Sequence, residues 1–152
     1  TAEAVRAALD GGDLPSFVTT TGSRGLHIVI RLVASAHVDA LRPFARAIAR
    51  QVAEAYPKLA TAEQRKAKRG DRVLVDTFRT AYAQTAVGPY AVRARPGAPV
   101  ATPVTWDEAL GADMGAQRYT LANIFRRLGR TGDPWADIDA DPVPAFKLTH
   151  PG

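Results

Sequence analysis

The chain contains no cysteine, which excludes disulfide bonds and zinc sites built on thiolates. It has no apolar run near the roughly 18 residues that a membrane helix needs, and no basic-then-apolar signal peptide opens it. We therefore expect a soluble protein of the cytoplasm without a membrane partner. No internal repeat and no Walker phosphate loop is present. An initiator methionine is also missing, so we expect a piece of a longer polypeptide.

What is present is a basic but otherwise ordinary globular composition. The 152 residues suit one domain over 1–152, and 46% of them are apolar against 23% charged. Lys and Arg number 20 against 15 Asp and Glu, which gives a net charge of +5 and a pI near 10. This balance hints at an anionic partner such as nucleic acid or a nucleotide, although many basic proteins bind nothing acidic. The excess gathers at Arg65–Arg69, at Arg93 with Arg95, and at Arg126–Arg130.

Hydrophobic periodicity predicts helices and strands in mixed order. The predicted helices cover 2–10, 37–56, 62–68 with Thr61 as cap, 106–110, and 119–132 with Thr120 as cap and Gly129 or Gly132 at the end. The predicted strands cover 16–20, 26–33, 72–76 and 85–96, followed by an extended proline-rich link over 96–104 and an irregular tail over 139–152. Without a regular βαβ rhythm, the pattern favours an α+β fold with a mixed or antiparallel sheet and packed helices.

The turn between the first two strands reads "TTGSRGLH", Thr20 to His27. Glycine permits backbone N–H groups to converge on a phosphate. The hydroxyls of Thr21 and Ser23 and the charge of Arg24 would add contacts, and His27 begins the next strand within reach of a ligand held there. The alternative is an ordinary strand–strand turn with an exposed or hydrogen-bonded histidine.

Three further features carry possible chemistry. Asp76 ends the apolar segment "RVLVD", where a carboxylate suits a hard divalent cation or simply starts a turn. Arg93 and Arg95 would project from one face of a strand and suit a polyphosphate, or be solvated. The run "RKAKR" would be a solvated helix face or a contact for a nucleic-acid backbone.

Two weaker features complete the candidates. Possible base-stacking aromatic residues, which more often pack in a core, are Tyr56, Phe78, Tyr82 and Tyr90. Asp137 and Asp139 make a superficial Asp-x-Asp pair, but they sit in a proline-rich segment without an apolar strand, so we expect them to be solvated.

The order and spacing of these features resemble the polymerase domain of bacterial DNA ligase D, a member of the archaeo-eukaryotic primase superfamily. The resemblance covers about residues 5–138 and is carried by "SFVTTTGSRGLHIVIRL", then "RKAKRGDRVLVDTFRTAYAQTAVGPYAVRARPGAPVATPVTWDE", then "GDPWADI". It implies a primase-polymerase fold with an RRM-like core. The family's loop is Thr-Ser-Gly-x-x-Gly-x-His, and Thr21 stands here in place of its serine.

The resemblance also implies roles for individual residues. The residues expected to hold an incoming nucleotide are Thr21, Ser23, Arg24, His27, Arg79, Arg93 and Arg95. Asp76 would be a catalytic carboxylate and a ligand of Mn²⁺ or Mg²⁺. The residues expected at template or primer DNA are Lys66, Lys68, Arg69 and Gln84, although Ala83 replaces a glycine of the family's pattern.

The family's paired Asp-x-Asp metal ligands, on a strand before the first helix here, are absent from these residues. Because two-metal nucleotidyl transfer needs carboxylates that hold both ions, we expect this chain alone not to polymerise. The resemblance thus implies part of a nucleotidyltransferase, a nucleoid-associated template-dependent polymerase or primase. It would add NTPs or dNTPs at double-strand-break ends in non-homologous end joining, with DNA ends, a ligase domain and the Ku end-binding protein as partners. The alternative is a non-catalytic nucleotide- or DNA-binding module derived from this family.

Overall fold

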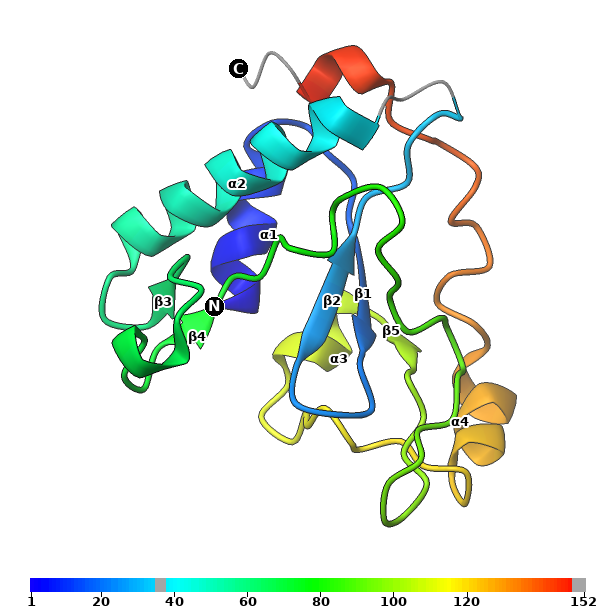
Figure 1. Cartoon of the computed structure of the whole chain (residues 1–152). Helices are drawn as coiled ribbons and strands as arrows, with labels where there is room; N and C mark the ends of the chain where they lie inside the picture. Colours follow the sequence, from blue (N-terminus) through cyan, green and yellow to red (C-terminus); the bar gives the residue numbers. More distant parts are fainter. Residues whose placement is uncertain (35–37, 149–152) are drawn as a thin grey trace. The chain divides into compact units, whose positions relative to one another are not determined.

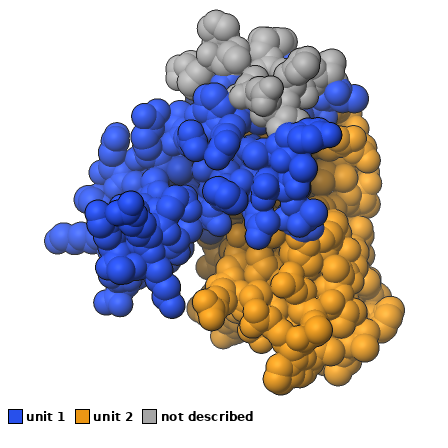
Figure 2. Space-filling view, in the orientation of Figure 1, with its two compact units in different colours: residues 1–15, 32–86, 143–152 blue, residues 16–31, 87–142 orange. Residues whose placement is uncertain are grey.

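A computed structural model describes residues 1–34 and 38–148 of the chain, in helices and short strands (Figure 1). The chain divides into two compact units, which Figure 2 distinguishes by colour. Unit 1 is built from residues 1–15, 32–86 and 143–152, and unit 2 from residues 16–31 and 87–142. Helices and strands are mixed in both units, which confirms the α+β class.

Unit 1 is built around two helices, α1 (Ala2–Asp10) and α2 (Val38–Ala55), which pack on each other (Figure 1). Both helices agree closely with the predicted ranges. The apolar stripe of α2 explains the packing, because Ile48 and Val52 are buried while Arg46 and Arg50 on other faces are exposed. Leu9 is the buried residue of α1.

A small parallel pair of strands follows α2 in unit 1. Strand β3 (Ala60–Thr61) pairs with β4 (Val73–Leu74), so that Ala60 faces Val73 and Thr61 faces Leu74. The predicted helix over 62–68 was wrong: only the 3₁₀ turn η1 (Lys66–Lys68) forms. Thr61 is buried within β3, and its hydroxyl accepts the Glu63 N–H at 3.1 Å, which turns the chain instead of starting a helix.

Unit 2 contains a three-stranded antiparallel sheet in the order β2–β1–β5. Its strands are β1 (Phe17–Thr20), β2 (Leu26–Val29) and β5 (Pro103–Val104). The first two strands were predicted, but residues 96–104 were wrongly expected to be only a link. Their last residues pair with β1, where Val18 faces Val104. Proline is tolerated there because β5 is an edge strand.

The core of unit 2 forms on one side of β1. Val18, Val104 and Ala109 are buried together, and the partly buried residues packed against them are Leu26, Trp106, Met114 and Tyr119. Helix α3 (Trp106–Leu110) was predicted and begins with a capping box between Thr105 and Glu108. Helix α4 (Ile124–Thr131) begins later than predicted.

Two further local predictions, the Thr120 cap and the strand over 85–96, were wrong. Asn123 precedes α4 as its N-cap residue, and Thr120 donates its backbone N–H to the Asn123 side chain at 2.9 Å instead of capping the helix. The helix ends at Gly132, whose φ of 68° explains the glycine. Residues 85–96 form no regular strand, and only Val92 bridges to Val100.

The tail is more regular than expected as far as residue 148. Val143 is buried and bridges to Leu32, and a 3₁₀ turn, η2 (Ala145–Leu148), follows it within unit 1. The remaining residues of the predicted irregular tail, 149–152, lie outside the described residues. No helix in the described part of the chain has both the length and the apolar character needed to cross a bilayer.

Candidate functional site

The glycine-rich loop of unit 2 is a tight turn organised by the hydroxyl of Thr21. That hydroxyl donates to the Gly25 carbonyl at 2.9 Å and lies 3.2 and 3.3 Å from the N–H groups of Ser23 and Gly25, whose hydrogen bonds it accepts. The Thr21 N–H also donates to the Gly25 carbonyl at 3.0 Å. The side chain therefore fixes the shape of the loop.

The backbone donors of this loop differ in their exposure. Within residues 1–34 and 38–148, the N–H groups of Gly22 and Arg24 form no hydrogen bond, but Gly22 is buried whereas Arg24 is exposed, so the Arg24 N–H is the donor that an anion can reach. The Ser23 carbonyl accepts a hydrogen bond from the Gln117 amide at 2.8 Å, which ties the loop to the rest of unit 2. Free amides beside a guanidinium are the ordinary parts of a phosphate-binding turn.

Arg93 lies directly against the loop. Gly22 has a φ of 60°, and a Cβ added to it would lie 2.7 Å from the Arg93 Cγ and 3.3 Å from the Ala101 nitrogen. Only glycine fits there, since both the backbone conformation and the space exclude a side chain. The structure thus brings together Arg93 and the loop residues that were predicted as one site.

Arg95 and His27 are placed differently from the expectation. Arg95 is exposed and donates its backbone N–H to the Arg93 carbonyl at 2.8 Å. The two arginines therefore lie in a turn, and the predicted common face of a strand was wrong. His27 is half-buried in β2, where it faces Thr19 across the β1–β2 pair, two residues after Gly25.

Asp76 lies in unit 1, at the start of a turn. Its Oδ1 accepts the Phe78 N–H at 2.9 Å, and the side chain is exposed. Arg79 donates to the Gln84 side chain at 3.3 Å, which joins two of the predicted site residues. Asp76 offers the oxygen donor that Mg²⁺ or Mn²⁺ prefers. No group of three potential ligands forms anywhere in residues 1–34 and 38–148, so these residues do not make a complete metal site.

The predicted DNA-contacting run follows β3 in unit 1. Lys66 and Lys68 are exposed on η1. Arg69 is half-buried, and its guanidinium donates to the Glu63 carbonyl at 2.9 Å and the Gln64 carbonyl at 2.5 Å. Arg69 therefore braces its own loop, whereas the two lysines present charge to solvent.

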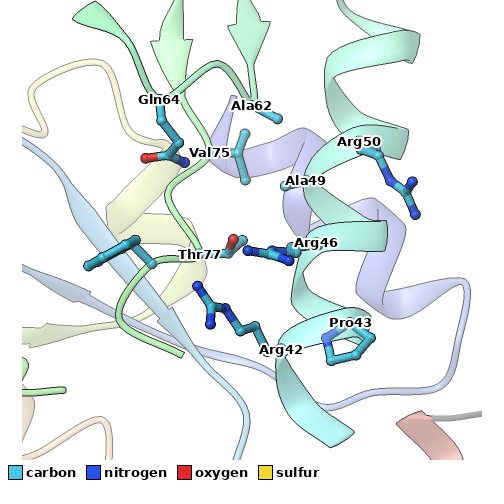
Figure 3. Close-up of a pocket in the computed structure, with 10 residues that line it drawn as sticks. Arg42, Pro43, Arg46, Ala49, Arg50, Ala62, Gln64, Val75 and Thr77 are labelled. Carbon is cyan, nitrogen blue, oxygen red and sulfur yellow. The ribbon is translucent and has the colours of Figure 1, made fainter. Parts of the chain in front are cut away.

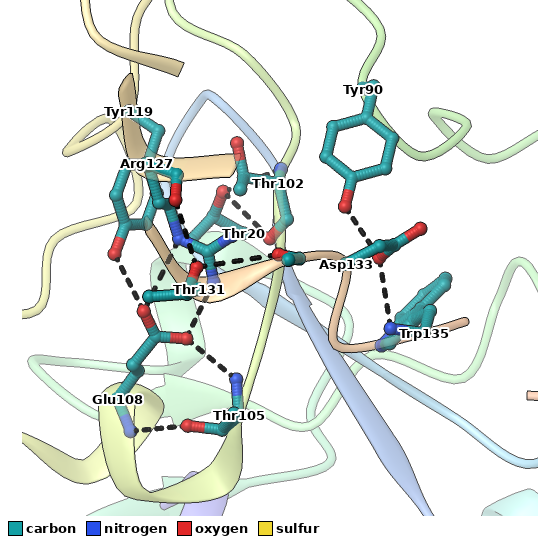
Figure 4. A network of polar contacts seen from close by, with 11 residues as sticks. Thr20, Tyr90, Thr102, Thr105, Glu108, Tyr119, Arg127, Thr131, Asp133 and Trp135 are labelled. Atoms are coloured by element: carbon teal, nitrogen blue, oxygen red, sulfur yellow. Dashed lines mark hydrogen bonds and ion pairs between the residues drawn. The ribbon is translucent and has the colours of Figure 1, made fainter. Parts of the chain in front are cut away.

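The third basic group divides into two environments. Arg126 and Arg130 are exposed on α4, but Arg127 is buried. Its guanidinium donates to both carboxylate oxygens of Glu108, at 2.7 and 3.3 Å, and lies 4.8 Å from the centre of the Tyr119 ring (Figure 4). This ion pair fastens α4 to α3, so Arg127 is a structural residue within a cluster that the sequence presents as uniform.

Burial and hydrogen bonds perturb two titratable groups in this region. Burial alone would raise the pKa of Glu108, but the hydrogen bond from Arg127, the Thr105 N–H and the Arg127 charge together hold that pKa below its ordinary value. Burial and the hydrogen bond to Asp133 raise the pKa of Tyr90. The Tyr90 hydroxyl donates to Asp133 at 2.6 Å (Figure 4), which gives this aromatic residue a bracing role.

Sequence reasoning missed a cleft in unit 1, between α2 and the segments after β3 and β4. Its lining includes Arg42, Arg46 and Arg50, which lie between the apolar positions of the predicted helix over 37–56 (Figure 3). The spacing of four residues between these arginines was the available signal, because it places them along one side of a helix.

Comparisons with known proteins find similarity over most of the chain. A family model for the LigD primase-polymerase domain matches residues 1–135. The multifunctional non-homologous end joining protein LigD of Mycolicibacterium smegmatis is 36% identical over 148 residues, or 97% of this chain and 19% of that protein. The Pseudomonas aeruginosa protein of the same name is 34% identical over 131 residues, or 85% of this chain and 16% of that protein.

A solved structure agrees in fold. The polymerase domain from Mycobacterium tuberculosis ligase D, in complex with DNA, has a TM-score of 0.84 and 30% identity to this chain. The match covers 93% of this chain and 48% of that domain. The chain thus spans about a fifth of the length of the curated relatives it matches and about half of the solved domain.

Proposed function

Because the chain belongs to the LigD primase-polymerase domain family, we propose that it is part of a DNA repair polymerase that adds nucleotides at double-strand-break ends in non-homologous end joining. The relatives named above are multifunctional end-joining proteins, and the solved relative is a polymerase domain bound to DNA. The proposed substrates are an NTP or dNTP and a primer end paired to a template. The proposed partners are a ligase domain and the Ku protein.

The observation that carries this proposal is the packing of Arg93 on the glycine loop. The Arg93 Cγ packs against Gly22, in the same loop in which the exposed Arg24 has a backbone N–H without a hydrogen bond among the described residues. A triphosphate carries several negative charges and needs such converging donors. The remaining side chains proposed to hold the nucleotide are Thr21, Ser23, Arg24, His27, Arg79 and Arg95.

In this conformation Thr21 supports phosphate binding indirectly. Its hydroxyl proton is directed to the Gly25 carbonyl, so its main contribution is to hold the loop in the shape that leaves the Arg24 N–H exposed and without a hydrogen bond among the described residues. Serine can make the same hydrogen bonds, which explains how Thr21 stands where the family's pattern has serine.

The proposed reaction joins the 3′-oxygen of the primer to the α-phosphorus of the bound nucleotide. The bond from that phosphorus to the oxygen that bridges it to the β-phosphate breaks, pyrophosphate leaves, and the hydroxyl proton passes to solvent. A bound Mn²⁺ or Mg²⁺ would supply positive charge at the reacting phosphate. Asp76 would hold it together with carboxylates from outside these 152 residues, so we propose that this chain alone does not polymerise.

On the DNA side, we propose that Lys66 and Lys68 contact the phosphate backbone. Both are exposed on η1 and form no ion pair with another described residue. Arg69 and Gln84 complete the proposed DNA-contacting set. Each is engaged with a neighbour in this structure but keeps donors for a phosphate, because Gln84 accepts only through its Oε1 and Arg69 donates through its Nε and Nη2.

The test is template-dependent nucleotide addition by a polypeptide that carries this chain together with the Asp-x-Asp strand. We expect Asp76→Ala to abolish addition and Asp76→Glu to retain part of it. Asp71→Ala, a change of another exposed carboxylate in unit 1, is the matched control and should leave the rate unchanged. Full activity of Asp76→Ala would refute the role of Asp76.

A non-catalytic binding module is the second candidate, favoured by the lack of a three-ligand group in the described residues. Two observations together distinguish this module from part of a polymerase. They are a titration of the 152-residue chain with a nucleoside triphosphate and the coding sequence upstream of Thr1. Binding without any encoded Asp-x-Asp strand supports the module. An encoded Asp-x-Asp strand supports the polymerase.

A further inference from the structure

The cleft in unit 1 has a volume of about 620 Å³. One wall is the side of α2 that carries Arg42, Arg46 and Arg50, and the other is formed by residues that follow β3 and β4. Figure 3 shows the guanidinium groups of Arg42 and Arg46 directed from α2 toward the segment of Thr77, whereas Arg50 points in a different direction. The volume lies within the range of pockets that hold ligands of nucleotide size.

The electrostatics of this cleft are one-sided. Its lining contains three arginines and no acidic residue. Arg42 and Arg46 form no ion pair or hydrogen bond with the side chains that the structure describes in residues 1–34, 41–144 and 147–148, although Glu63 and Asp76 are sequence neighbours of the lining. Two guanidinium groups that line one cleft without an acidic residue in its lining favour an anionic ligand.

The spacing of the charges indicates what kind of anion fits. Arg42 and Arg46 are four residues apart, so they are separated by about 6 Å along the helix axis. A ligand with a repeated negative charge can use both, whereas a single carboxylate can use only one. The repeated charge of a nucleic-acid backbone meets this requirement.

The remaining lining residues favour a nucleotide over a simple polyanion. Phe78 is 54% exposed and lines the cleft, and a ring presented to solvent can stack on a base. Ala49, Ala62 and Val75 supply an apolar surface, and Gln64 and Thr77 supply polar groups. Aromatic residues beside a positively charged groove are the usual features of single-strand binding.

We propose that this cleft binds a single-stranded segment of DNA, with backbone phosphates on Arg42 and Arg46 and one base stacked on Phe78. The proposal rests on the proposed function only in choosing DNA as the polyanion. It assigns DNA contacts to the α2 side of unit 1, separate from the run at Lys66–Arg69. Because Thr77 and Phe78 directly follow Asp76, the bound strand would pass beside the proposed metal ligand.

The experiment measures binding of a fluorescein-labelled oligo-dT 12-mer to the 152-residue chain by anisotropy between 50 and 200 mM salt. We expect Arg42→Ala/Arg46→Ala to weaken binding about tenfold at 50 mM salt. The slope of log K against log salt should fall by about 1.4, since each phosphate contact on a single strand contributes about 0.7. Phe78→Ala should weaken binding about fivefold or more and leave the slope unchanged.

Matched controls are available on α4 of unit 2. Arg126→Ala/Arg130→Ala removes the same charge from exposed positions, and Phe125→Ala removes a ring that is 73% exposed. Both controls should bind as the wild type does. If the Arg126/Arg130 control loses as much affinity for the 12-mer as the Arg42/Arg46 variant, the effect is due to net charge and the cleft assignment is overturned. Wild-type affinity in the cleft variants would also overturn it. So would the absence of binding by the wild-type chain.

Amide chemical-shift changes in the wild-type chain test the site without any substitution. Changes on adding the 12-mer should concentrate at residues 42–50 and 75–78, and changes elsewhere only would overturn the proposal. Inorganic triphosphate and poly-glutamate are the competing probes. If either displaces the 12-mer from these residues at an equal concentration of charge, the proposal is overturned. Nucleotide addition that depends on Asp76 while the cleft variants bind normally would leave the proposed function standing and reject only the cleft.

Discussion

Arg127→Met removes the buried guanidinium of α4 while keeping most of its apolar stem. In the folded chain Arg127 is 7% exposed and donates two hydrogen bonds to Glu108, at 2.7 and 3.3 Å. It also lies 4.8 Å from the Tyr119 ring centre. The substitution leaves the Glu108 carboxylate with the Thr105 N–H and the Tyr119 hydroxyl as partners.

The size of the effect follows from how deeply each partner is buried. Breaking a fully buried ion pair costs about 3–5 kcal/mol, but the Glu108 side chain is 27% exposed and can regain some hydration. The Arg127 Nη1 is buried without a hydrogen-bond partner among the described residues, so removing it returns about 1 kcal/mol. We expect a net loss of about 2–3 kcal/mol, or a Tm lower by roughly 4–12 °C for a chain of this size.

The loss should depend on pH in a defined direction. The folded-state pKa of Glu108 is below its ordinary value of 4.5, so its contribution to stability is present above that pH and is lost as the pH falls through the folded pKa. Without Arg127 the Glu108 carboxylate loses the charge and the hydrogen bond that lower its pKa, so the variant loses less stability than the wild type on acidification. The difference between wild type and variant should therefore narrow below about pH 4.5.

The assay is urea unfolding at pH 7 and pH 4, with Arg126→Met as the control. The two arginines are adjacent in sequence, but Arg126 is exposed, so Arg126→Met should change the unfolding free energy by less than about 0.5 kcal/mol. A similar small loss in Arg127→Met, or a loss that is independent of pH, would show that the ion pair does not fasten α4 as described.

Three further predictions concern the glycine loop. Gly22→Ala should destabilise the loop by about 1–3 kcal/mol and reduce triphosphate binding in a titration, whereas Gly25→Ala, which meets nothing within 4 Å, should be near neutral in both; equal effects would contradict the contact with Arg93. Thr21→Val should weaken nucleotide binding because the loop loses its central hydroxyl, and Thr21→Ser should restore it; identical affinities would show that the hydroxyl is dispensable. Gln117→Ala should weaken binding a few-fold, in line with one neutral hydrogen bond, without lowering the Tm by more than a few degrees; unchanged affinity would exclude a positioning role.

Much of the secondary structure was predictable because it depends on local periodicity. The helices over 2–10 and 37–56 and the strand at 16–20 follow from apolar spacing within each segment. Errors arose where a partner outside the segment decides the outcome. Thr61 lies in β3 because it pairs with Leu74 of β4, and the end of the proline-rich segment at 96–104 becomes a strand because it pairs with β1.

In the candidate site, too, local sequence pattern predicted some features, and contacts with distant segments decided others. The glycine loop was selected from its residue types and spacing, and Arg93, which was predicted for the same site, lies against Gly22. The shared strand face proposed for Arg93 and Arg95 was wrong, because hydrogen bonds to Arg93 and Pro99 bend this segment into turns. The sequence also did not specify the role of Thr21 as the hydrogen-bonding centre of the loop, since residue type alone does not show which groups a hydroxyl contacts.

By itself, the sequence determined the fold class, the family and the identity of most candidate site residues. These depend on residue type and spacing along the chain. Only the tertiary structure decided which of two adjacent arginines is buried, that Arg93 rests on Gly22, and that Arg42 and Arg46 line a cleft. Burial, partners and concavity are produced by segments far apart in sequence, and no pattern within one segment specifies them.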